Sequence, residues 1–189
     1  MRQINEAGMR LIKGFEGCSL TAYPDPASPL GRACAHAHVG EGGYKKIPNW
    51  QSLSGTPWTI AWGRTENNDG TPIKEGDTCT QEQADAALLF DVQREGSHFV
   101  DAWVRVLSDI DDNEYAALSS FVYNAGAGTF HHSAILMLVN ERKWFEAANA
   151  FLPFDTAQGT ELAGLARRRK AERALFLGDI AEMDRILAE

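Results

Sequence analysis

Residues 58–65 read WTIAWGRT, and this stretch decides the fold. It is rich in aromatic and β-branched residues and is followed by the turn-forming cluster Asn67–Gly70, a pattern that is typical of a β-strand. A single strand needs a partner, and residues 20–23 are the nearest candidate. The sequence therefore predicts a small antiparallel sheet.

Helical patterns flank this predicted sheet on both sides. Apolar residues recur with helical spacing from Ile4 to Phe15, where Asn5 or a neighbour can cap the helix. After the sheet, Thr80 and Gln83 form a capping box before a helical pattern that continues to about Val106. Such a helix is long enough to bridge two lobes. Asp111 and Glu114 form a second capping signal before a helix predicted at residues 115–123. Further helices are predicted at residues 134–140, 144–151, 161–177 and 180–187.

Together these patterns predict an α+β fold. We expect a small antiparallel sheet lobe and a larger, all-helical lobe, joined by the long helix, with a cleft between them. The expected single domain spans residues 1–189. Its sheet lobe lies at about 14–79, the N-terminal helix joins residues 80–178 in the helical lobe, and residues 179–189 form a C-terminal extension.

Composition and charge exclude several classes of protein. The chain has 189 residues, 44% of them hydrophobic, and carries a net charge of −8, so a broad nucleic-acid-binding face is disfavoured. The one dense basic cluster, Arg167–Arg173, is interpreted as solvated helix surface; pairing with acidic neighbours and contact with an anionic partner are the alternatives. We find neither an apolar signal-peptide core nor an apolar run long enough for a membrane span, and we therefore expect accumulation in the cytoplasm.

The predicted sheet lobe also contains a candidate pair of catalytic carboxylates. Glycoside hydrolysis uses one protonated and one ionised carboxyl group. Glu16 follows Phe15 on a mostly apolar helix, which favours the neutral acid, whereas Asp25 lies in a polar, proline-flanked turn, which favours the carboxylate. Thr59 opens the strand that should return beside them. Alone the pairing is weak, because the chain has 26 acidic residues.

Five motifs, in this order, give the pair more weight: GFEG (14–17), TAYPDP (21–26), WTIAWGRT (58–65), FVYNAGAG (121–128) and GLARRR (164–169). Together they resemble the phage-type lysozymes of glycoside hydrolase family 24, the endolysins of tailed phages. The resemblance runs from about Ile4 to Gly178. It implies a muramidase that needs no cofactor and cuts the β-1,4 bond between N-acetylmuramic acid and N-acetylglucosamine in peptidoglycan.

The resemblance places the family's catalytic residues on Glu16, Asp25 and Thr59. Glu16 would be the general acid, while Asp25 and the Thr59 hydroxyl would activate a water molecule on the opposite face of the sugar and invert the anomeric carbon. Tyr23 and Trp58 flank the acidic pair and are candidates for lining the cleft.

Asn124 ends the helical motif that faces the cleft in the family, so a hydrogen bond to a substrate sugar is expected. A purely structural role at the C-terminus of the helix is the alternative.

The strand departs from the family pattern at two positions. Ala61 replaces a glycine and Arg64 replaces a histidine. Because arginine stays charged near neutral pH, we expect Arg64 to form a structural ion pair with an acidic residue of the sheet lobe.

The larger departure is an insertion at about residues 26–57, where the family more often has a short hairpin. It is either a flap that binds a particular cell wall or a surface loop without a role. Cys34, His36 and His38 alternate within it and would share one face of a strand. A zinc site would need Cys18, Cys79 or a carboxylate as its fourth ligand. Because no recognised motif is present, we assign no metal and interpret these as polar loop residues with a half-buried thiol. A Cys18–Cys34 disulfide, formed after release from the cytoplasm, is a further alternative.

Two other functions compete with the muramidase. A lytic transglycosylase attacks the same bond without water, and a catalytically silent module would only bind the wall or build the virion. We expect a monomer that acts on peptidoglycan, binds no nucleic acid and does not insert stably into membranes. The resemblance implies release from the host cytoplasm to the periplasm and cell wall through a holin, for host cell lysis. The net charge of −8 implies binding by local contacts and a weak dependence on salt.

Overall fold

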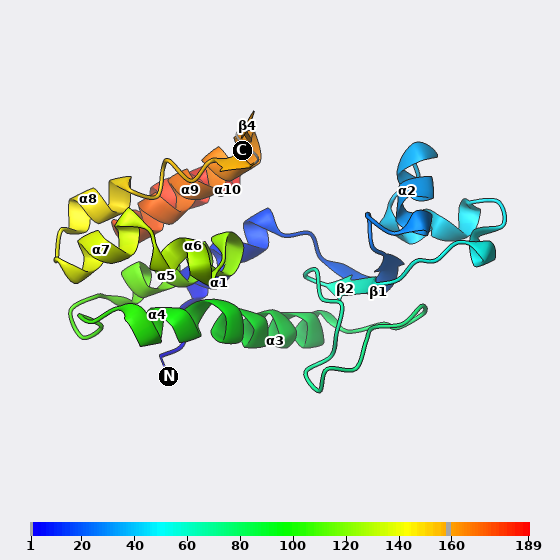
Figure 1. Cartoon of the computed structure of the whole chain (residues 1–189), viewed down its shortest axis with the longest axis horizontal. Coiled ribbons are helices and arrows are strands. Elements are labelled where there is room, and N and C mark those ends of the chain that lie inside the picture. Colours follow the sequence, from blue (N-terminus) through cyan, green and yellow to red (C-terminus); the bar gives the residue numbers. More distant parts are fainter. Residues whose placement is uncertain (1, 158–159) are drawn as a thin grey trace. The chain divides into compact units, whose positions relative to one another are not determined.

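The computed structural model describes residues 2–157 and 160–189. The chain forms two compact units (Figure 1). Residues 16–88 form the sheet unit, and residues 1–15 together with 89–189 form the helical unit. Helix α3 (Gln81–Val92) begins in the sheet unit and ends in the helical unit, so the boundary falls inside a continuous helix.

The predicted hairpin is confirmed. Strand β1 (Ser19–Pro24) pairs antiparallel with β2 (Trp58–Ala61), and Tyr23 lies opposite Thr59. The register shifts between Ser19 and Tyr23, which is the mark of a β-bulge.

Strand β2 ends four residues earlier than the sequence predicted. Ala61 adopts the left-handed conformation, with φ of 56°, and Gly63 also has a positive φ. The backbones of Ile60 and Arg64 then exchange two hydrogen bonds, of 2.8 and 2.9 Å, across a tight turn. The chain therefore turns back at the position where the family pattern has a glycine.

The sheet unit contains two small hydrophobic clusters. The cluster under the hairpin consists of Ala22, Ile60, Ala61, Ile73 and Ala84. The other belongs to the insertion and consists of Leu30, Cys34, Tyr44 and Ile47. Trp58 packs against both clusters and so links the insertion to the hairpin.

The insertion is helical, and the expectation of a loop or strand there was wrong. It contains α2 (Pro29–His36) and two short 3-10 turns, η1 (Glu41–Lys46) and η2 (Trp50–Ser52). The hydroxyl of Ser28 accepts a hydrogen bond from the Gly31 N–H, and proline occupies the first helical position. Both features favour the start of a helix.

The two ends of the insertion meet. The N–H of Asp25 lies 3.3 Å from the Gly55 carbonyl oxygen and 3.0 Å from that of Pro57. The N–H of Leu30 donates to the Ser54 carbonyl oxygen at 2.9 Å. The chain thus leaves the hairpin and returns to it at one place.

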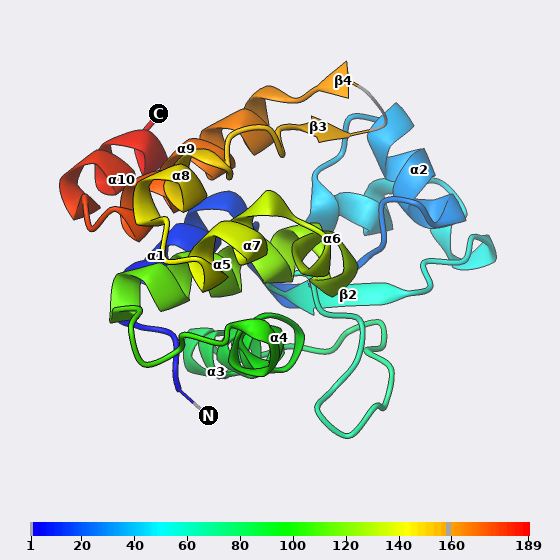
Figure 2. The ribbon, with the colours of Figure 1, turned by 60° about the vertical axis from the view of Figure 1, so that its left-hand side comes forward.

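The helical unit is built around α5 (Asp112–Ala125), whose residues 115–122 are all buried. Figure 2 shows the helices that accompany it. Helices α1 (Glu6–Phe15) and α9 (Ala163–Phe176) both pack against α5. The remaining helices are α4 (His98–Trp103), α6 (Ala127–His131), α7 (Ala134–Asn140), α8 (Trp144–Asn149) and α10 (Ile180–Leu187).

The capping signals read from the sequence are confirmed. The Asn5 side chain accepts from the Gly8 N–H at 2.9 Å. Thr80 and Gln83 form the capping box of α3, and Asp111 with Glu114 forms that of α5. These side chains satisfy N–H groups that lack partners inside the helix.

The predicted long helix is interrupted. A π-helical turn, η3 (Gln93–Ser97), separates α3 from α4, and the helix ends at Trp103. Gly96 sits in this turn, where an added Cβ would come within 2.6 Å of the Ser119 carbonyl oxygen. Only glycine allows the helix to approach α5 so closely.

Two further expectations for the helical lobe need correction. The lobe is not entirely helical, because two short strands, β3 (Thr156–Ala157) and β4 (Thr160–Glu161), pair antiparallel before α9. The Arg167–Arg173 cluster is not solvated surface either: Arg168 and Arg169 are only 3% and 1% exposed. Tertiary packing places them inside the unit, beside the fully buried Glu172. In the part of the chain that the structure describes, no helix is both long and apolar enough to cross a membrane.

Candidate active site

Strand pairing brings Asp25 and Thr59 to the same end of the hairpin. Tyr23 lies opposite Thr59, and Pro24 lies opposite Trp58, so Asp25 immediately follows the last paired residue of β1. One carboxylate oxygen of Asp25 accepts from the Ala27 N–H at 2.7 Å. This local turn fixes the carboxylate where the insertion begins.

Thr59 is a buried polar residue at the start of β2. It is 5% exposed, and its hydroxyl has no hydrogen-bond partner among the described residues. An unsatisfied buried hydroxyl costs about 1–3 kcal/mol of folding free energy. Residues that carry such a cost cluster at functional sites, where the missing partner is a ligand or a water molecule.

Glu16 follows the last residue of α1 and is half-buried. It belongs to the sheet unit, as do Asp25 and Thr59. The predicted acid, the predicted base and the predicted hydroxyl are therefore all carried by one compact unit of 73 residues, 16–88.

Trp58 and Tyr23 are half-buried members of the same hairpin. The Trp58 ring lies edge-on to the ring of Tyr44, with their centroids 5.1 Å apart. Much of the Trp58 side chain is thus used to join the insertion to the hairpin. Sugar binding by Tyr23 and Trp58 stays a prediction.

Asn124 is an exposed residue of the helical unit, next to the last residue of α5. Its side-chain oxygen accepts a hydrogen bond from the buried guanidinium of Arg169. Both residues line a pocket of about 290 Å³, together with Thr129 and Phe154. Sequence reasoning named Asn124 but missed Arg169, because an arginine in a basic run resembles solvated surface.

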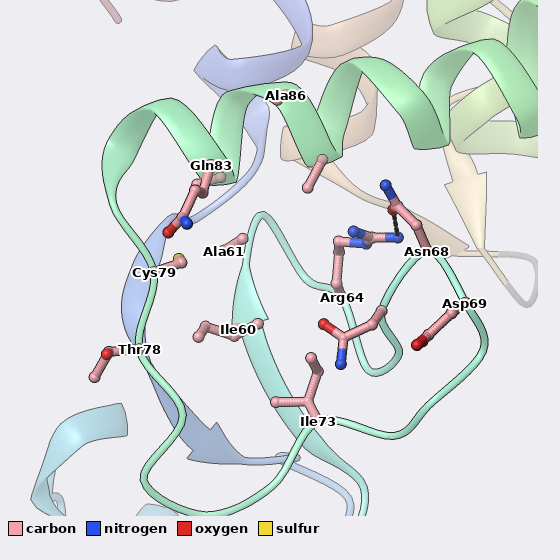
Figure 3. A pocket seen from close by; sticks show the side chains of 13 residues that line it. Ile60, Ala61, Arg64, Asn68, Asp69, Ile73, Thr78, Cys79, Gln83 and Ala86 are labelled. Atoms are coloured by element: carbon pink, nitrogen blue, oxygen red, sulfur yellow. Dashed lines mark hydrogen bonds between the residues drawn. The ribbon is translucent and has the colours of Figure 1, made fainter.

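A pocket of the sheet unit borders β2 at Ile60 and Ala61 (Figure 3). It measures about 580 Å³, with an apolar floor that includes Ile60, Ile73 and Ala84. Arg64 and Asn68 stand at its rim, where the guanidinium donates to the Asn68 side-chain oxygen at 2.7 Å. None of the predicted site residues lines this pocket.

The cysteines are free thiols, and their arrangement differs from the considered Cys18–Cys34 pair. Cys18 lies near Cys79. Burial raises the pKa of the Cys79 thiol, and the electrostatic interaction with Cys18 adds to this effect. Cys34 is buried in the insertion core, and this burial raises the pKa of its thiol.

Cys34, His36 and His38 do not lie on one face of a strand, as the sequence suggested. In a helix, residues two apart point to opposite sides, so Cys34 faces the core while His36 is exposed. Among the residues that the structure describes, no three histidine, cysteine, aspartate or glutamate side chains are grouped to hold a metal ion.

Comparison with known proteins identifies the family. The sequence profile described as phage lysozyme matches residues 13–172. The chain belongs to the phage lysozyme family. It is 32% identical to the endolysin of Salmonella phage P22 over 177 residues, which cover 94% of this chain and 99% of that protein.

Solved lysozyme structures are similar to this phage lysozyme. A structure of P22 lysozyme superposes with a TM-score of 0.70 at 30% identity and covers 94% of this chain and 99% of its own. The muramidase domain of SpmX from Asticaccaulis excentricus gives a TM-score of 0.66 at 30% identity, with the same shares of both chains covered. The chain spans only 54–60% of the length of the Bacillus and Lactococcus phage endolysins that it matches.

Proposed function

We propose that this phage lysozyme is an endolysin muramidase that hydrolyses the β-1,4 bond between N-acetylmuramic acid and N-acetylglucosamine in peptidoglycan. The observation that carries the proposal is the pairing of Tyr23 with Thr59, which brings Asp25 and the buried, unpartnered Thr59 hydroxyl to one end of the hairpin. Membership of the phage lysozyme family supports the same chemistry.

In the proposed mechanism Glu16 donates a proton to the glycosidic oxygen. Asp25 and the Thr59 hydroxyl hold a water molecule and direct it to the opposite face of the sugar ring. Asp25 has accepting capacity left for this water, because the hydrogen bond from the Ala27 N–H uses one of its two oxygens. Attack by water from that face inverts the anomeric configuration.

The first test is lysis of permeabilised Gram-negative cells by the wild type and by Glu16→Gln. We expect the variant to lose a factor of about 10²–10⁴ in rate, the usual contribution of a general acid. Asp25→Asn should lose a similar factor. Glu66→Gln is the matched control, because it removes an exposed carboxylate of the same unit. Substantial lysis by folded Glu16→Gln would refute the assignment.

The reaction products separate the hydrolase from its competitors. Hydrolysis leaves a reducing sugar, whereas a lytic transglycosylase leaves an anhydro sugar that is lighter by one water molecule. A hydrolase with inversion should release the α-anomer first, which proton NMR can detect before mutarotation. Absence of any cleavage would favour a silent wall-binding or virion module.

The biological setting is part of the proposal. We expect a monomer that accumulates in the host cytoplasm, reaches the periplasm through a holin pore and lyses the host. Because the net charge is −8, attraction of the whole protein to anionic peptidoglycan cannot drive binding. Lysis rates should therefore change little between low and physiological salt, and a steep loss would contradict binding through local contacts.

A further inference from the structure

The insertion differs from the rest of the chain in its charge. Residues 26–57 contain three basic residues, Arg32, Lys45 and Lys46, against the single acid Glu41. The insertion therefore carries a net charge of +2, and the remaining 157 residues carry −10. A cationic segment on an acidic protein points to a local anionic partner rather than to attraction of the whole molecule.

A small pocket of about 290 Å³ lies on the outer side of the insertion. It is lined by Arg32, Ala35, His36 and His38. Arg32 and His36 are four residues apart on α2, so they lie one above the other on its outward face. Leu30 and Cys34, on the inward face, fix the helix to the insertion core.

His38 reaches this pocket by adopting an uncommon backbone conformation. Its φ is 51°, and two hydrogen bonds close the end of α2 around it. The His38 N–H donates to the Ala35 carbonyl oxygen at 3.1 Å, and the Val39 N–H donates to that of Cys34 at 3.0 Å. This is a Schellman motif, whose left-handed position usually holds glycine. A histidine there carries strain, yet it adds an imidazole to the pocket wall.

The Arg32 guanidinium has no carboxylate partner among the described residues. Its one hydrogen bond within the part of the chain that the structure describes goes from Nη1 to the Ala27 carbonyl oxygen. Two other exposed arginines do pair with acids: Arg10 with Asp184, and Arg142 with Asp109. Arg32 thus keeps most of its donors free for an outside anion.

We propose that this pocket binds a carboxylate of the peptide stems of peptidoglycan. A guanidinium recognises a planar carboxylate through two parallel hydrogen bonds. The imidazoles of His36 and His38 add N–H donors at the same pocket. At neutral pH the pocket has one permanent positive charge, which matches one monoanionic carboxylate. The proposal rests on peptidoglycan as the substrate of the proposed function.

Binding at this pocket would hold the wall directly on the sheet unit. The insertion leaves the hairpin immediately after Asp25 and returns just before Thr59, and its ends are fixed by the bonds from the Asp25 N–H. Trp58 joins its core to the hairpin core. A captured stem is therefore connected to the proposed catalytic residues through a packed module rather than a loose loop.

The direct test titrates the full chain with N-acetyl-L-alanyl-D-glutamate, a soluble stem fragment without a glycosidic bond. The readout is the imidazole proton and carbon shifts of His36 and His38, identified from their glutamine variants. We expect saturable shifts of both rings, and we expect Arg32→Gln to weaken binding by about tenfold to a hundredfold. Inorganic phosphate is the comparison anion. Binding of phosphate alone, without the peptide, would overturn the carboxylate assignment.

Two control variants separate the pocket from general charge and from helix capping. The double variant Lys45→Gln with Lys46→Gln removes more charge than Arg32→Gln but leaves the pocket intact, so binding should persist. Equal losses in both variants would overturn the pocket. His38→Gly relieves the strained position and should raise the unfolding midpoint while it weakens peptide binding. If His38→Gly binds the peptide as tightly as the wild type, His38 does not contact the ligand, and that part of the proposed pocket is wrong.

A second measurement uses intact walls. Glu16→Gln protein should sediment with purified sacculi, and adding Arg32→Gln should lower the bound fraction several-fold. Glycan strands stripped of stems by an amidase should abolish this difference, and persistence of the difference would overturn stem binding. The peptide titration measures binding at the pocket even if the chain cleaves no glycosidic bond. Lysis by the Arg32→Gln single variant measures hydrolysis even if the pocket binds no peptide.

Discussion

Two clusters of basic residues in this lysozyme have opposite environments. In α9, Arg168 and Arg169 are buried and share the carboxylate of Glu172, at 3.3 and 3.0 Å. Ser120 donates a further hydrogen bond to Glu172 at 2.8 Å. In the insertion, Arg32 lines a pocket that faces solvent. Its guanidinium has no carboxylate partner among the described residues. The first cluster shares a carboxylate inside the fold, and the second faces solvent.

The comparison shows that basic residues in a sequence acquire their role from burial and from partners. Burial lowers the pKa of Arg169, and the Glu172 carboxylate opposes this effect. Removing a partner from a buried ion pair leaves a charge that water cannot reach. Replacing an exposed arginine by a neutral residue changes the free energy of unfolding very little. Substitutions in the two clusters should therefore differ strongly in their effect on stability.

The largest effect is expected for Glu172→Gln. The substitution keeps the size of the side chain but removes the anion between the two buried guanidiniums. We expect the free energy of unfolding to fall by about 3–5 kcal/mol, measured by urea denaturation. Glu182→Gln breaks an exposed pair with Arg185 and should leave the midpoint nearly unchanged. Similar midpoints for both variants would remove the distinction between buried and exposed clusters.

The next effect concerns the core that supports the exposed cluster. Leu30 is fully buried between α2 and the rest of the insertion. Leu30→Ala should cost about 2–5 kcal/mol, because it leaves a cavity in a packed interior. Since Trp58 connects this core to the hairpin, the loss should appear in the global unfolding transition. If hydrogen exchange instead shows that the variant loses amide protection only within the insertion, the insertion unfolds independently of the hairpin.

Thr59 provides an intermediate case, since it is a buried polar group with no partner. Thr59→Val replaces the hydroxyl with a methyl group of similar size. We expect the free energy of unfolding to rise by about 1 kcal/mol, because an unsatisfied polar group disappears. The lysis rate should fall at the same time, a trade-off typical of active sites. A less stable valine variant would mean that the hydroxyl has a partner in the folded protein.

The smallest effect on stability is expected for Arg32→Gln. An exposed side chain whose one described bond goes to the backbone should change the free energy of unfolding by less than about 0.5 kcal/mol. Thermal denaturation of the variant beside the wild type measures this. A large loss would place Arg32 with the structural arginines of α9 and would weaken the case for a ligand pocket.

The parts of the fold that the sequence predicted are those with local signals. Asn5, the Thr80 capping box and the Asp111 capping box each mark a helix start, and the structure confirms all three. The hairpin partner was also predicted, because the chain offers few other strand-like segments near residues 58–61.

The insertion was misread because two of its signals conflict. Ser28 and Pro29 mark a helix start, but the dense proline and glycine around them are typical of loops. The alternation of Cys34, His36 and His38 then suggested a strand, although α2 has its apolar residues at the helical spacing of Leu30 and Cys34. A helix of eight residues gives too short a periodic pattern to decide.

The residues of the candidate site were named from the sequence, but their surroundings were not predicted. Glu16, Asp25 and Thr59 were named from motifs, and the structure carries them on one unit. The unpartnered state of the Thr59 hydroxyl and the burial of Arg168 and Arg169 depend on residues distant in sequence. Such properties arise only from tertiary packing, which a single sequence does not contain.

The meeting of the insertion's ends at Asp25 has an evolutionary consequence. Because the chain departs and returns beside one backbone N–H, a single genetic event can add or remove residues 26–57 without displacing either strand. The segment is then an exchangeable cassette. Its transplantation into a lysozyme with a short hairpin would transfer a core, a helix and a cationic pocket together, while the hairpin itself stays unaltered.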